Sequence, residues 1–408
     1  MKLTPLDIAG GFPLGINHDE TRLPDVGDLT PLAAFEDVVR TALQHPPCVV
    51  TFSGGRDSAA ILAVAARISR DEKLEPPIAV TVRFEGGLGT NEAGWQERVI
   101  AHSRVREWIR ITVGDEIDLV GPVARPLLVR YGVMYPPHTP LFALQLQHAK
   151  GGSMLTGFGG DAIIGGWIPA HSAEVLARHA LPRPSDMLTL GYAVAPRFVR
   201  AAYMRARMQR RAWLRPAAHR QYEDARVAEW STRPFRRDSF LLWQLRLRRS
   251  AVVEQTFSQL AAGVNAQALH PLHDRRFVAA LARDLGPRGG GDRTSVMRRL
   301  FADELPDDVL SRKGKANFAV AYLRRYSREF ARRWDGIGLD TELVDPDLLR
   351  KAWLEWIVDP LSALALQAAW LSSFERGLED PVTDIVEAGQ VAKTVNSPEG
   401  QPGQLEHD

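Results

Sequence analysis

The sequence predicts an α/β protein: a parallel sheet with helices on both faces, followed by a mainly helical half. In residues 31–170, short runs of apolar and β-branched residues recur, and helical segments separate them. This alternation is typical of βαβ units, which build a parallel sheet covered on both faces. After about Trp167 the strand patterns vanish, while helical patterns continue to about Leu378.

The first elements surround one buried strand. Residues 1–30 are rich in Gly, Pro and Asp without periodicity, so we expect an irregular arm. The apolar spacing of residues 32–43 predicts a helix, and residues 48–52 (CVVTF) predict a buried parallel strand. The segment SGGRDS follows and leads into a strongly helical stretch that begins at Ala59.

The next elements repeat this pattern. We predict further strands at residues 78–84, 108–113 and 153–158, and helices at residues 91–103 and 141–149. Four parallel strands with intervening helices therefore account for the first part of the chain.

The composition is that of an ordinary globular protein, with 45% apolar and 25% charged residues in 408. A formal net charge of +2 gives no reason to expect a polyelectrolyte partner for the whole chain. The only cysteine, Cys48, excludes a disulfide framework and a thiolate metal cluster. Because there is no run of 18 apolar residues and no secretory pattern at the start, we expect a cytoplasmic protein without a membrane partner.

The segment SGGRDS at 53–58 lies between a buried strand and a strong helix. Glycines let the backbone approach phosphate oxygens, and N–H groups at a helix N-terminus attract anions. We therefore expect a nucleotide-phosphate site, and its residues are Ser53, Gly54, Gly55, Asp57 and Ser58. A carboxylate in a phosphate site requires a cation, so Asp57 is a candidate Mg²⁺ ligand. The alternative is a tight turn capped by Asp or Ser.

Two segments together resemble a known family. SGGRDS resembles the pyrophosphate-binding loop of the N-type ATP pyrophosphatases. These enzymes split ATP into AMP and pyrophosphate while they adenylate a substrate. The segment is not a GxxxxGK[ST] loop, because the lysine and the spacing of that motif are absent. TGFGGD at 156–161, followed by IIGGW, resembles the glycine-rich segment of the asparagine synthetase superfamily, and more closely its form in β-lactam synthetase and lasso-peptide cyclases. The resemblance implies an adenine nucleotide alpha hydrolase-like fold and the use of ATP and Mg²⁺.

The second segment also supplies candidate site residues. Gly157, Gly159 and Gly160 are expected to admit the nucleotide, and Asp161 to be a second Mg²⁺ ligand. A helix N-cap is the alternative role for Asp161. Two carboxylates on neighbouring strand ends would then hold one metal ion on the pyrophosphate.

A third segment, LPDDVLSRKGKANF at 305–318, resembles the LP…R.K..F segment of the same family. By the K-x-x-F spacing, Lys315 matches the catalytic lysine of the family, which is expected to stabilise charge that develops during adenylation. Lys313 is the rival position, and a basic surface loop is the alternative interpretation.

The sequence departs from the family pattern at the general base. Phe158 and Ala162 stand where relatives carry a glutamate or tyrosine and a further acidic residue, so any general base must come from elsewhere. Glu254 is the candidate, although a reactive amine needs none. His270 and His273, in HPLHD, resemble a structural turn of the family, and two histidines without a third ligand are poor evidence for a metal site.

A further departure concerns the nitrogen donor. The second residue is Lys2, where glutamine-dependent relatives carry a nucleophilic cysteine, so we expect neither a glutaminase domain nor glutamine-derived ammonia. The predicted organisation is an arm at 1–30, a synthetase domain at 31–385 with an α/β nucleotide-binding part at 31–170 and a helical part at 171–385, and a disordered tail at 386–408.

The resemblance, which covers about residues 32–378, implies ATP-dependent amide formation through an acyl-adenylate, with release of AMP and pyrophosphate. The missing ammonia supply favours a peptide or natural-product carboxylate as substrate. The amine would lie on the same molecule, as in a macrolactam, or on a second small molecule. A separate precursor-peptide-binding protein is a candidate partner.

Two other functions stay open. A tRNA-modifying adenylase is favoured by the arginine-rich region 197–249, which also fits a solvated helical face whose arginine stems cover apolar surface. We favour the solvated face, so nucleic acid is not the expected partner. An inactive scaffold is favoured by Phe158 and Ala162.

We predict that Lys315→Ala lowers substrate-dependent pyrophosphate release by about 10²–10³, because the ammonium would face oxygens that gain negative charge. Stability should change by only a few tenths of a kcal/mol in a thermal melt, since a lysine in a glycine-containing loop has little packing value. Lys313→Ala is the control and should retain turnover. The opposite result for the two variants would mean that the motif assignment is wrong by two residues.

Overall fold

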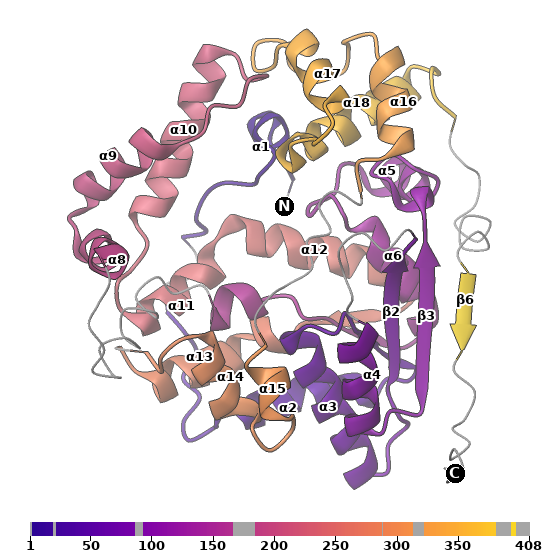
Figure 1. Cartoon of the computed structure of the whole chain (residues 1–408), viewed down its shortest axis with the longest axis vertical. Coiled ribbons are helices and arrows are strands. Elements are labelled where there is room, and N and C mark those ends of the chain that lie inside the picture. Colours follow the sequence, from indigo (N-terminus) through magenta and orange to yellow (C-terminus); the bar gives the residue numbers. More distant parts are fainter. Residues whose placement is uncertain are drawn as a thin grey trace, which may run out of the picture.

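The computed structural model describes residues 2–18, 22–85, 93–165, 184–287, 289–312, 322–380 and 393–396. The strands form a six-stranded sheet with the order β5-β4-β1-β2-β3-β6, and Figure 1 shows β2, β3 and β6 on its right side. The strands are β1 (Cys48–Thr51), β2 (Ile78–Phe84), β3 (Glu107–Val113), β4 (Ser153–Leu155), β5 (Gln267–Leu269) and β6 (Lys393–Asn396). Strands β1 to β5 pair in parallel, and β6 pairs antiparallel with β3.

The helices of the described chain fall into two groups. Those that precede or connect the first strands are α1 (Pro5–Gly10), α2 (Pro31–Leu43), α3 (Arg56–Asp71), α4 (Ala93–Ser103), α5 (Ala124–Tyr131) and α6 (Pro140–Leu146). Those of the later half are α8 (Pro184–Val194), α9 (Arg197–Arg207), α10 (Pro216–Ser231), α11 (Arg237–Arg246), α12 (Arg248–Ala262), α13 (Arg275–Leu285), α14 (Arg293–Phe301), α15 (Asp307–Leu310), α16 (Arg325–Arg333), α17 (Pro346–Leu354) and α18 (Ala363–Glu375). None of these described helices combines the length and the apolarity needed to cross a bilayer.

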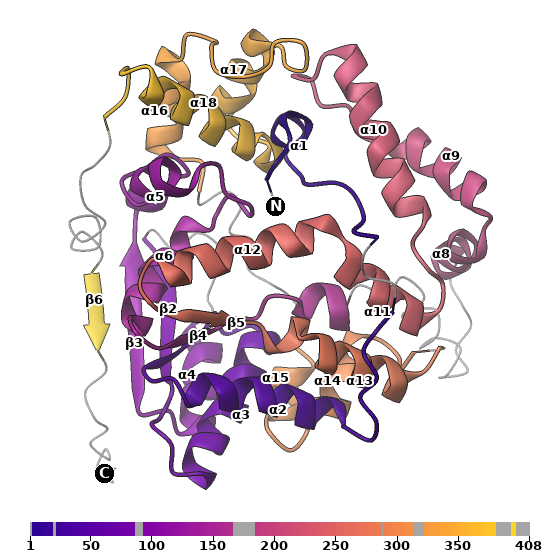
Figure 2. The same ribbon diagram turned by 180° about the vertical axis from the view of Figure 1, so that it is seen from behind.

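Alternate residues of the central strands enter two different hydrophobic cores. Val49 and Val80 pack with residues of α5, α6 and α12, whereas Val50 and Ala79 pack with residues of α2, α3 and α13. Because successive side chains of a strand point to opposite faces of the sheet, each face is covered by its own helices. Seen from behind, α2 and α12 lie on different sides of the sheet (Figure 2). The predicted α/β fold, with helices on both faces and a helical half, is confirmed.

Four expectations about regular structure need correction. The arm at 1–30 contains a helix, α1. Its N-cap residue Thr4 and its third residue, Asp7, form a reciprocal capping box. The helical half contains a strand, because β5 pairs with β4. Within the segment expected to be disordered, residues 393–396 form the edge strand β6. The predicted fourth strand is also shorter, since β4 ends at Leu155.

The order of the strands places two chain segments side by side. β1 continues through α3 to β2 on one side, while β4 lies on the other side of β1. This reversal is a topological switch point, and in open α/β sheets ligands bind outside the carboxyl ends of the strands at such a point. SGGRDS follows β1 and TGFGGD follows β4, so both segments meet there.

The N-terminal arm is fixed to the helical half by a buried ion pair. Arg248, the first residue of α12, donates to the Asp7 carboxylate over 2.6 Å, and the backbone N–H groups of Thr4 and Leu14 donate to the same carboxylate over 2.8 and 3.1 Å. The Asp7 side chain is only 6% exposed. Removal of the carboxylate would therefore leave the Arg248 charge without its partner in a poorly solvated place.

We predict that Asp7→Ala lowers the free energy of unfolding by about 3 kcal/mol, the loss expected when one partner of a buried ion pair is removed. Urea denaturation would measure the change. Asp224→Ala is a matched control, because it breaks the exposed ion pair with Arg205 and should cost at most about 0.5 kcal/mol. Equal effects of the two substitutions would show that Asp7 contributes no more than a surface pair.

Candidate active site

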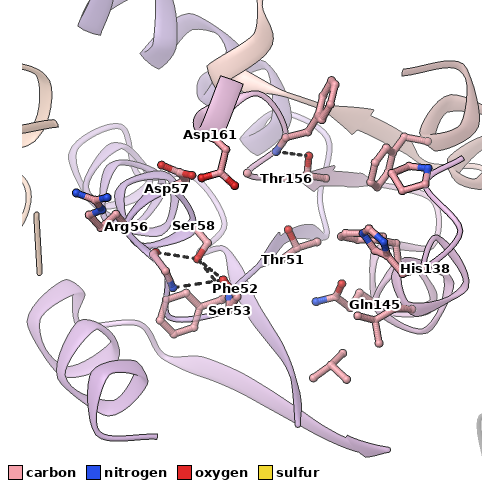
Figure 3. A pocket seen from close by; sticks show the side chains of 18 of the residues that line it. Thr51, Phe52, Ser53, Arg56, Asp57, Ser58, His138, Gln145, Thr156 and Asp161 are labelled. Atoms are coloured by element: carbon pink, nitrogen blue, oxygen red, sulfur yellow. Dashed lines mark hydrogen bonds between the residues drawn. The ribbon is translucent and has the colours of Figure 1, made fainter. Parts of the chain in front are cut away.

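A cavity of about 380 Å³ lies at the carboxyl ends of β1, β2 and β4. Figure 3 shows Arg56, Asp57 and Asp161 on one side of it and His138 and Gln145 on the opposite side. The cavity therefore has two ends of different chemistry. The residues of the charged end are Arg56, Asp57, Asp161, Arg293 and Arg312, and the largely uncharged remainder of the wall includes Val82, Phe84, Leu141, Phe142, Phe158, Phe257 and Tyr322.

The loop after β1 holds its shape by its own hydrogen bonds. The Ser58 hydroxyl accepts from the Ser53 N–H over 3.2 Å and donates to the Gly55 carbonyl over 3.1 Å. Gly54 has φ of 85°, a conformation that favours glycine. α3 begins at Arg56, so Asp57 lies in its first turn, where the helix dipole favours an anion. Of the expected loop residues, Ser53, Gly55, Asp57 and Ser58 line the cavity and Gly54 does not, and both serine hydroxyls also brace the loop.

The glycines after β4 allow close contact between protein segments. Gly159 has φ of 94°, and a Cβ on it would lie 2.8 Å from the Cβ of His273. A Cβ on Gly160 would overlap the Asp57 carboxylate. We expect these glycines to admit a nucleotide, and Gly160 also lets the second segment approach Asp57. Gly157 lines the cavity.

The two candidate metal ligands converge on one arginine. Arg293, the first residue of α14, donates to Asp57 over 2.5 Å through Nη2 and to Asp161 through Nη1. Burial lowers the pKa of Arg293, but the two carboxylates more than offset this effect, so its pKa is raised. Sequence reasoning missed Arg293, since nothing in RTSVMRR separates it from the arginines that follow.

A second arginine that the sequence analysis did not single out supports the Asp161 segment. Arg237 of α11 is 1% exposed and donates to the carbonyl groups of Ile163 and Ile164 over 2.7 and 3.0 Å. Gln244, about two turns further along the same face of α11, donates to the Ala162 carbonyl over 3.1 Å. These carbonyl groups end a short π-helix, Gly160–Ile164, where they lack helical partners. α11 thereby fixes the position of Asp161.

Glu254, the candidate general base, lies beside the cavity and not among the residues that line it. Its carboxylate is 2.7 Å from Nδ1 of His273, whose ring packs on Phe158 with centroids 4.6 Å apart. Burial raises the pKa of Glu254, but the His273 hydrogen bond and neighbouring charges outweigh it, so the pKa lies below its ordinary value. Glu254 is therefore ionised at neutral pH and is linked to Phe158 through the His273 ring.

The histidines of HPLHD hold the second segment in place. His270 Nδ1 lies 2.6 Å from the Thr156 hydroxyl, and its ring packs on Phe158 and Phe257. Among the described residues no group of three His, Cys, Asp or Glu side chains gathers that could bind a metal by itself. The predicted structural role of this turn thus agrees with its contacts.

The candidate Lys315 and its rival Lys313 lie outside the described residues. The residues on either side of that stretch, Arg312 and Tyr322, both line the cavity. Arg312 donates to the Gly54 carbonyl over 2.9 Å, and the Tyr322 carbonyl accepts from the Leu119 N–H over 2.9 Å. Arg312 is thereby attached to the SGGRDS loop, and Tyr322 to the chain that follows β3.

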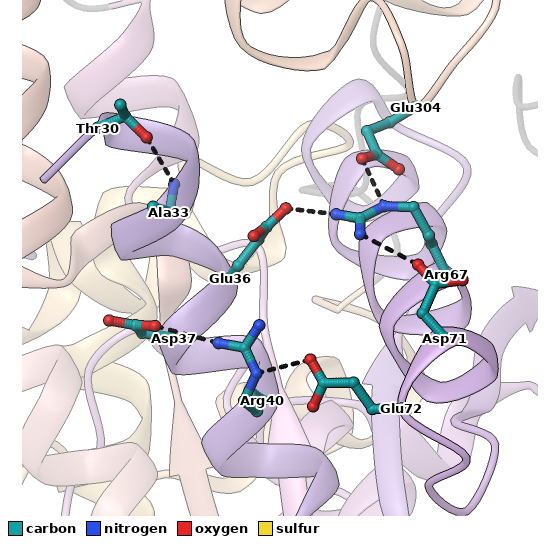
Figure 4. A network of polar contacts seen from close by, with 9 residues as sticks. All are labelled: Thr30, Ala33, Glu36, Asp37, Arg40, Arg67, Asp71, Glu72 and Glu304. Carbon is teal, nitrogen blue, oxygen red and sulfur yellow. Dashed lines mark hydrogen bonds and ion pairs between the residues drawn. The ribbon is translucent and has the colours of Figure 1, made fainter.

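A polar network on the outer surface continues this attachment (Figure 4). Arg67 of α3 donates to Glu304 over 2.7 Å and also pairs with Glu36 of α2. Because Glu304 directly precedes the LP of the third segment, the network fixes the start of this segment on the helix that carries Asp57.

We predict that His270 makes stability depend on pH. Burial lowers its pKa to about 4, so the native chain stays neutral where the unfolded chain, with an ordinary pKa of about 6.5, takes up a proton. Neutral His270 therefore contributes up to about 3 kcal/mol to the free energy of unfolding. This contribution is complete above about pH 6.5 and is lost as the pH falls towards 4. Urea denaturation at several pH values in this range should show that the free energy of unfolding of His270→Gln depends less on pH than that of the unmodified chain. The exposed His45→Gln is the control, and equal slopes for all three proteins would contradict the prediction.

Comparison with known proteins agrees with this geometry. The model of the family described as asparagine synthase matches residues 32–372, which include both glycine-containing segments, Arg293 and the third segment. No curated protein matches the sequence. A match over most of its length places the chain in the asparagine synthase family, whose members use ATP to form amide bonds.

Proposed function

We propose that this protein is an AMP-forming amide ligase that activates a peptide or natural-product carboxylate as an acyl-adenylate. The observation that carries the proposal is the single cavity in which the phosphate loop, two convergent carboxylates and an apolar wall meet. An amine would then attack the activated carbonyl carbon and release AMP.

The charged end of the cavity suits a triphosphate. Its described lining contains three arginines and two aspartates, and the N–H groups at the start of α3 add a partial positive charge. The absence of a Walker lysine in SGGRDS favours attack at the α-phosphorus with pyrophosphate as the leaving group. The loop N–H groups and the arginines would stabilise the charge on the phosphates as it develops.

The donor set at this end also fits Mg²⁺. Asp57 and Asp161 come from neighbouring strand ends and already converge on one cation, and Mg²⁺ in proteins commonly takes one or two carboxylates together with phosphate oxygens. Such an ion would neutralise charge on the leaving pyrophosphate. The two aspartates would hold it, and Gly160 allows their close approach.

The uncharged end suits the adenine base and an apolar acyl group. His138 stacks on Tyr322 with centroids 5.6 Å apart, and Phe142 packs on Phe257 at 4.7 Å. A neutral His270 lies directly behind the Phe158 and Phe257 side chains. A substrate with an extended apolar part therefore matches this wall better than a small, doubly charged amino acid does.

The buried thiol of this chain does not suit the release of ammonia from glutamine. Cys48, the one cysteine in the sequence, is 2% exposed in β1, and burial raises its pKa to about 11. Such a thiol is neither accessible nor ionised at neutral pH. An amine on the substrate or on a second small molecule fits better, and the ionised Glu254 beside the cavity is the candidate to accept its proton.

The proposal includes partners and a location. A precursor-peptide-binding protein would present a peptide substrate, and the cytoplasm would supply ATP. The arginine-rich region supports a tRNA substrate poorly, because Arg211 and Arg237 are buried and Arg248 and Arg249 pair with Asp7 and Glu229. An inactive scaffold is the alternative that the next experiment addresses.

We predict that ATP is cleaved between the α and β phosphorus atoms. With candidate carboxylates, product analysis should show AMP and pyrophosphate in equal amounts, and Asp57→Asn or Asp161→Asn should lower the rate strongly at limiting Mg²⁺, since each removes an anionic ligand without a change in size. Asp307→Asn, on the surface, is the control. ADP and phosphate as products would exclude the adenylate route, and no ATP binding at all would favour the scaffold.

A further inference from the structure

Arg293 occupies the place where the two candidate metal ligands meet. Its two terminal nitrogens each contact a different carboxylate, Asp57 at the end of β1 and Asp161 at the end of β4. The Arg293 side chain is 22% exposed, and that of Asp57 is 15% exposed. The Arg293–Asp57 contact, at such low exposure, is stronger and less screened by salt than a surface pair, whereas the Asp161 side chain is 56% exposed.

Two carboxylates this close would repel each other without a cation between them. The close approach of Gly160 to the Asp57 carboxylate brings Asp57 near the residue that follows, Asp161. Asp161 is restrained, because Arg237 and Gln244 hold the carbonyl groups that follow it. The backbone therefore keeps the two segments together, and a positive charge between the two carboxylates offsets their repulsion.

A guanidinium group and a divalent ion cannot both fill this position. Mg²⁺ binds oxygen at about 2.0–2.1 Å and requires a nearly octahedral shell, whereas Arg293 binds the Asp57 oxygen at 2.5 Å in a planar geometry. The positive charges of the two cations would also repel each other. Binding of one must weaken binding of the other.

Arg293 is also poorly satisfied where it lies. Its Nε is buried and makes no hydrogen bond within the described part of the chain. The helix that carries it is held separately, because Asp292 caps α14 through the Ser295 N–H and Arg56 donates to Thr294 over 3.1 Å. The Arg293 side chain can therefore leave the carboxylates without loss of the helix.

We propose that Arg293 is a built-in counter-ion that keeps the metal site in shape before the nucleotide binds and is displaced when Mg²⁺ arrives. The displaced guanidinium then faces the phosphate oxygens that enter with the metal. The exchange makes the site bind a free divalent ion weakly and a metal–nucleotide complex well, because only the complex supplies new anions for Arg293. This inference rests on the proposed Mg²⁺ role of Asp57 and Asp161.

The experiment uses Mn²⁺ alone as the probe, with the purified full chain and no nucleotide. Loss of the electron paramagnetic resonance signal of free Mn²⁺ gives the dissociation constant. Arg293→Met removes the competing charge but keeps an apolar stem. The variant should bind Mn²⁺ about tenfold more tightly than the unmodified chain, because the free energy of one charged hydrogen bond corresponds to about a tenfold change in the dissociation constant. Arg298→Met, on the same helix and paired with Asp307 at the surface, should bind like the unmodified chain.

Further variants keep the inference testable. Arg293→Lys retains a single point charge that cannot bridge both carboxylates, so it should tighten Mn²⁺ binding by less than Arg293→Met does. In the double variant Arg293→Met with Asp161→Asn the gain should vanish. In thermal melts, Mn²⁺ should raise the Tm of Arg293→Met more than that of the unmodified chain.

Unchanged or weaker Mn²⁺ binding by folded Arg293→Met would overturn the proposal. If that variant does not fold, unchanged or weaker binding by Arg293→Lys would do the same. The outcome is separate from the amide-ligase function, because Mn²⁺ binding needs neither ATP nor an acyl substrate. Failure to release pyrophosphate with any carboxylate would refute the function and leave the metal result standing.

Discussion

The close approach of Gly160 to the Asp57 carboxylate is the constraint on which the rest of the site depends. It joins the segment after β4 to the segment after β1 and therefore requires these strands to be neighbours in the sheet. It also brings two carboxylates together, and a cation between them offsets their repulsion. The Arg293 bridge can therefore be understood as a consequence of this one contact.

Much of the α/β part could be predicted because its signals are local. The run IAVTVRF is β-branched and apolar, and β2 has the predicted bounds. SGGRDS lies between a strand and a helix and therefore predicts a phosphate loop, and residues of this segment line the cavity. The helix α1 carried a signal that could have found it, since Thr4, Pro5 and Asp7 form a helix-start pattern without any apolar periodicity.

The remaining features could not be predicted because their causes are far away in the sequence. The strand β5 is three residues long, QAL, and exists because β4 offers it an edge. Arg237 and Arg293 belong to an arginine-rich half in which composition alone suggests a solvated surface. Only the fold reveals that Arg237 fills a buried site under the π-helix and that Arg293 reaches the carboxylates. Chain topology, and not local pattern, decides which arginines are internal.

The pairing of β5 with β4 has a consequence for how the chain folds during synthesis. The outer edge of β4 is available once residue 155 has emerged from the ribosome, yet its partner follows only at residues 267–269. At ordinary synthesis rates the interval is on the order of ten seconds. During it, a sheet edge of apolar residues, with Met154 and Leu155 among them, lacks its neighbour, and an unpaired edge is a template for association with other chains. The newly made first half should therefore be the form most prone to aggregation, so that chaperone binding during translation would benefit this protein more than chaperone binding after release.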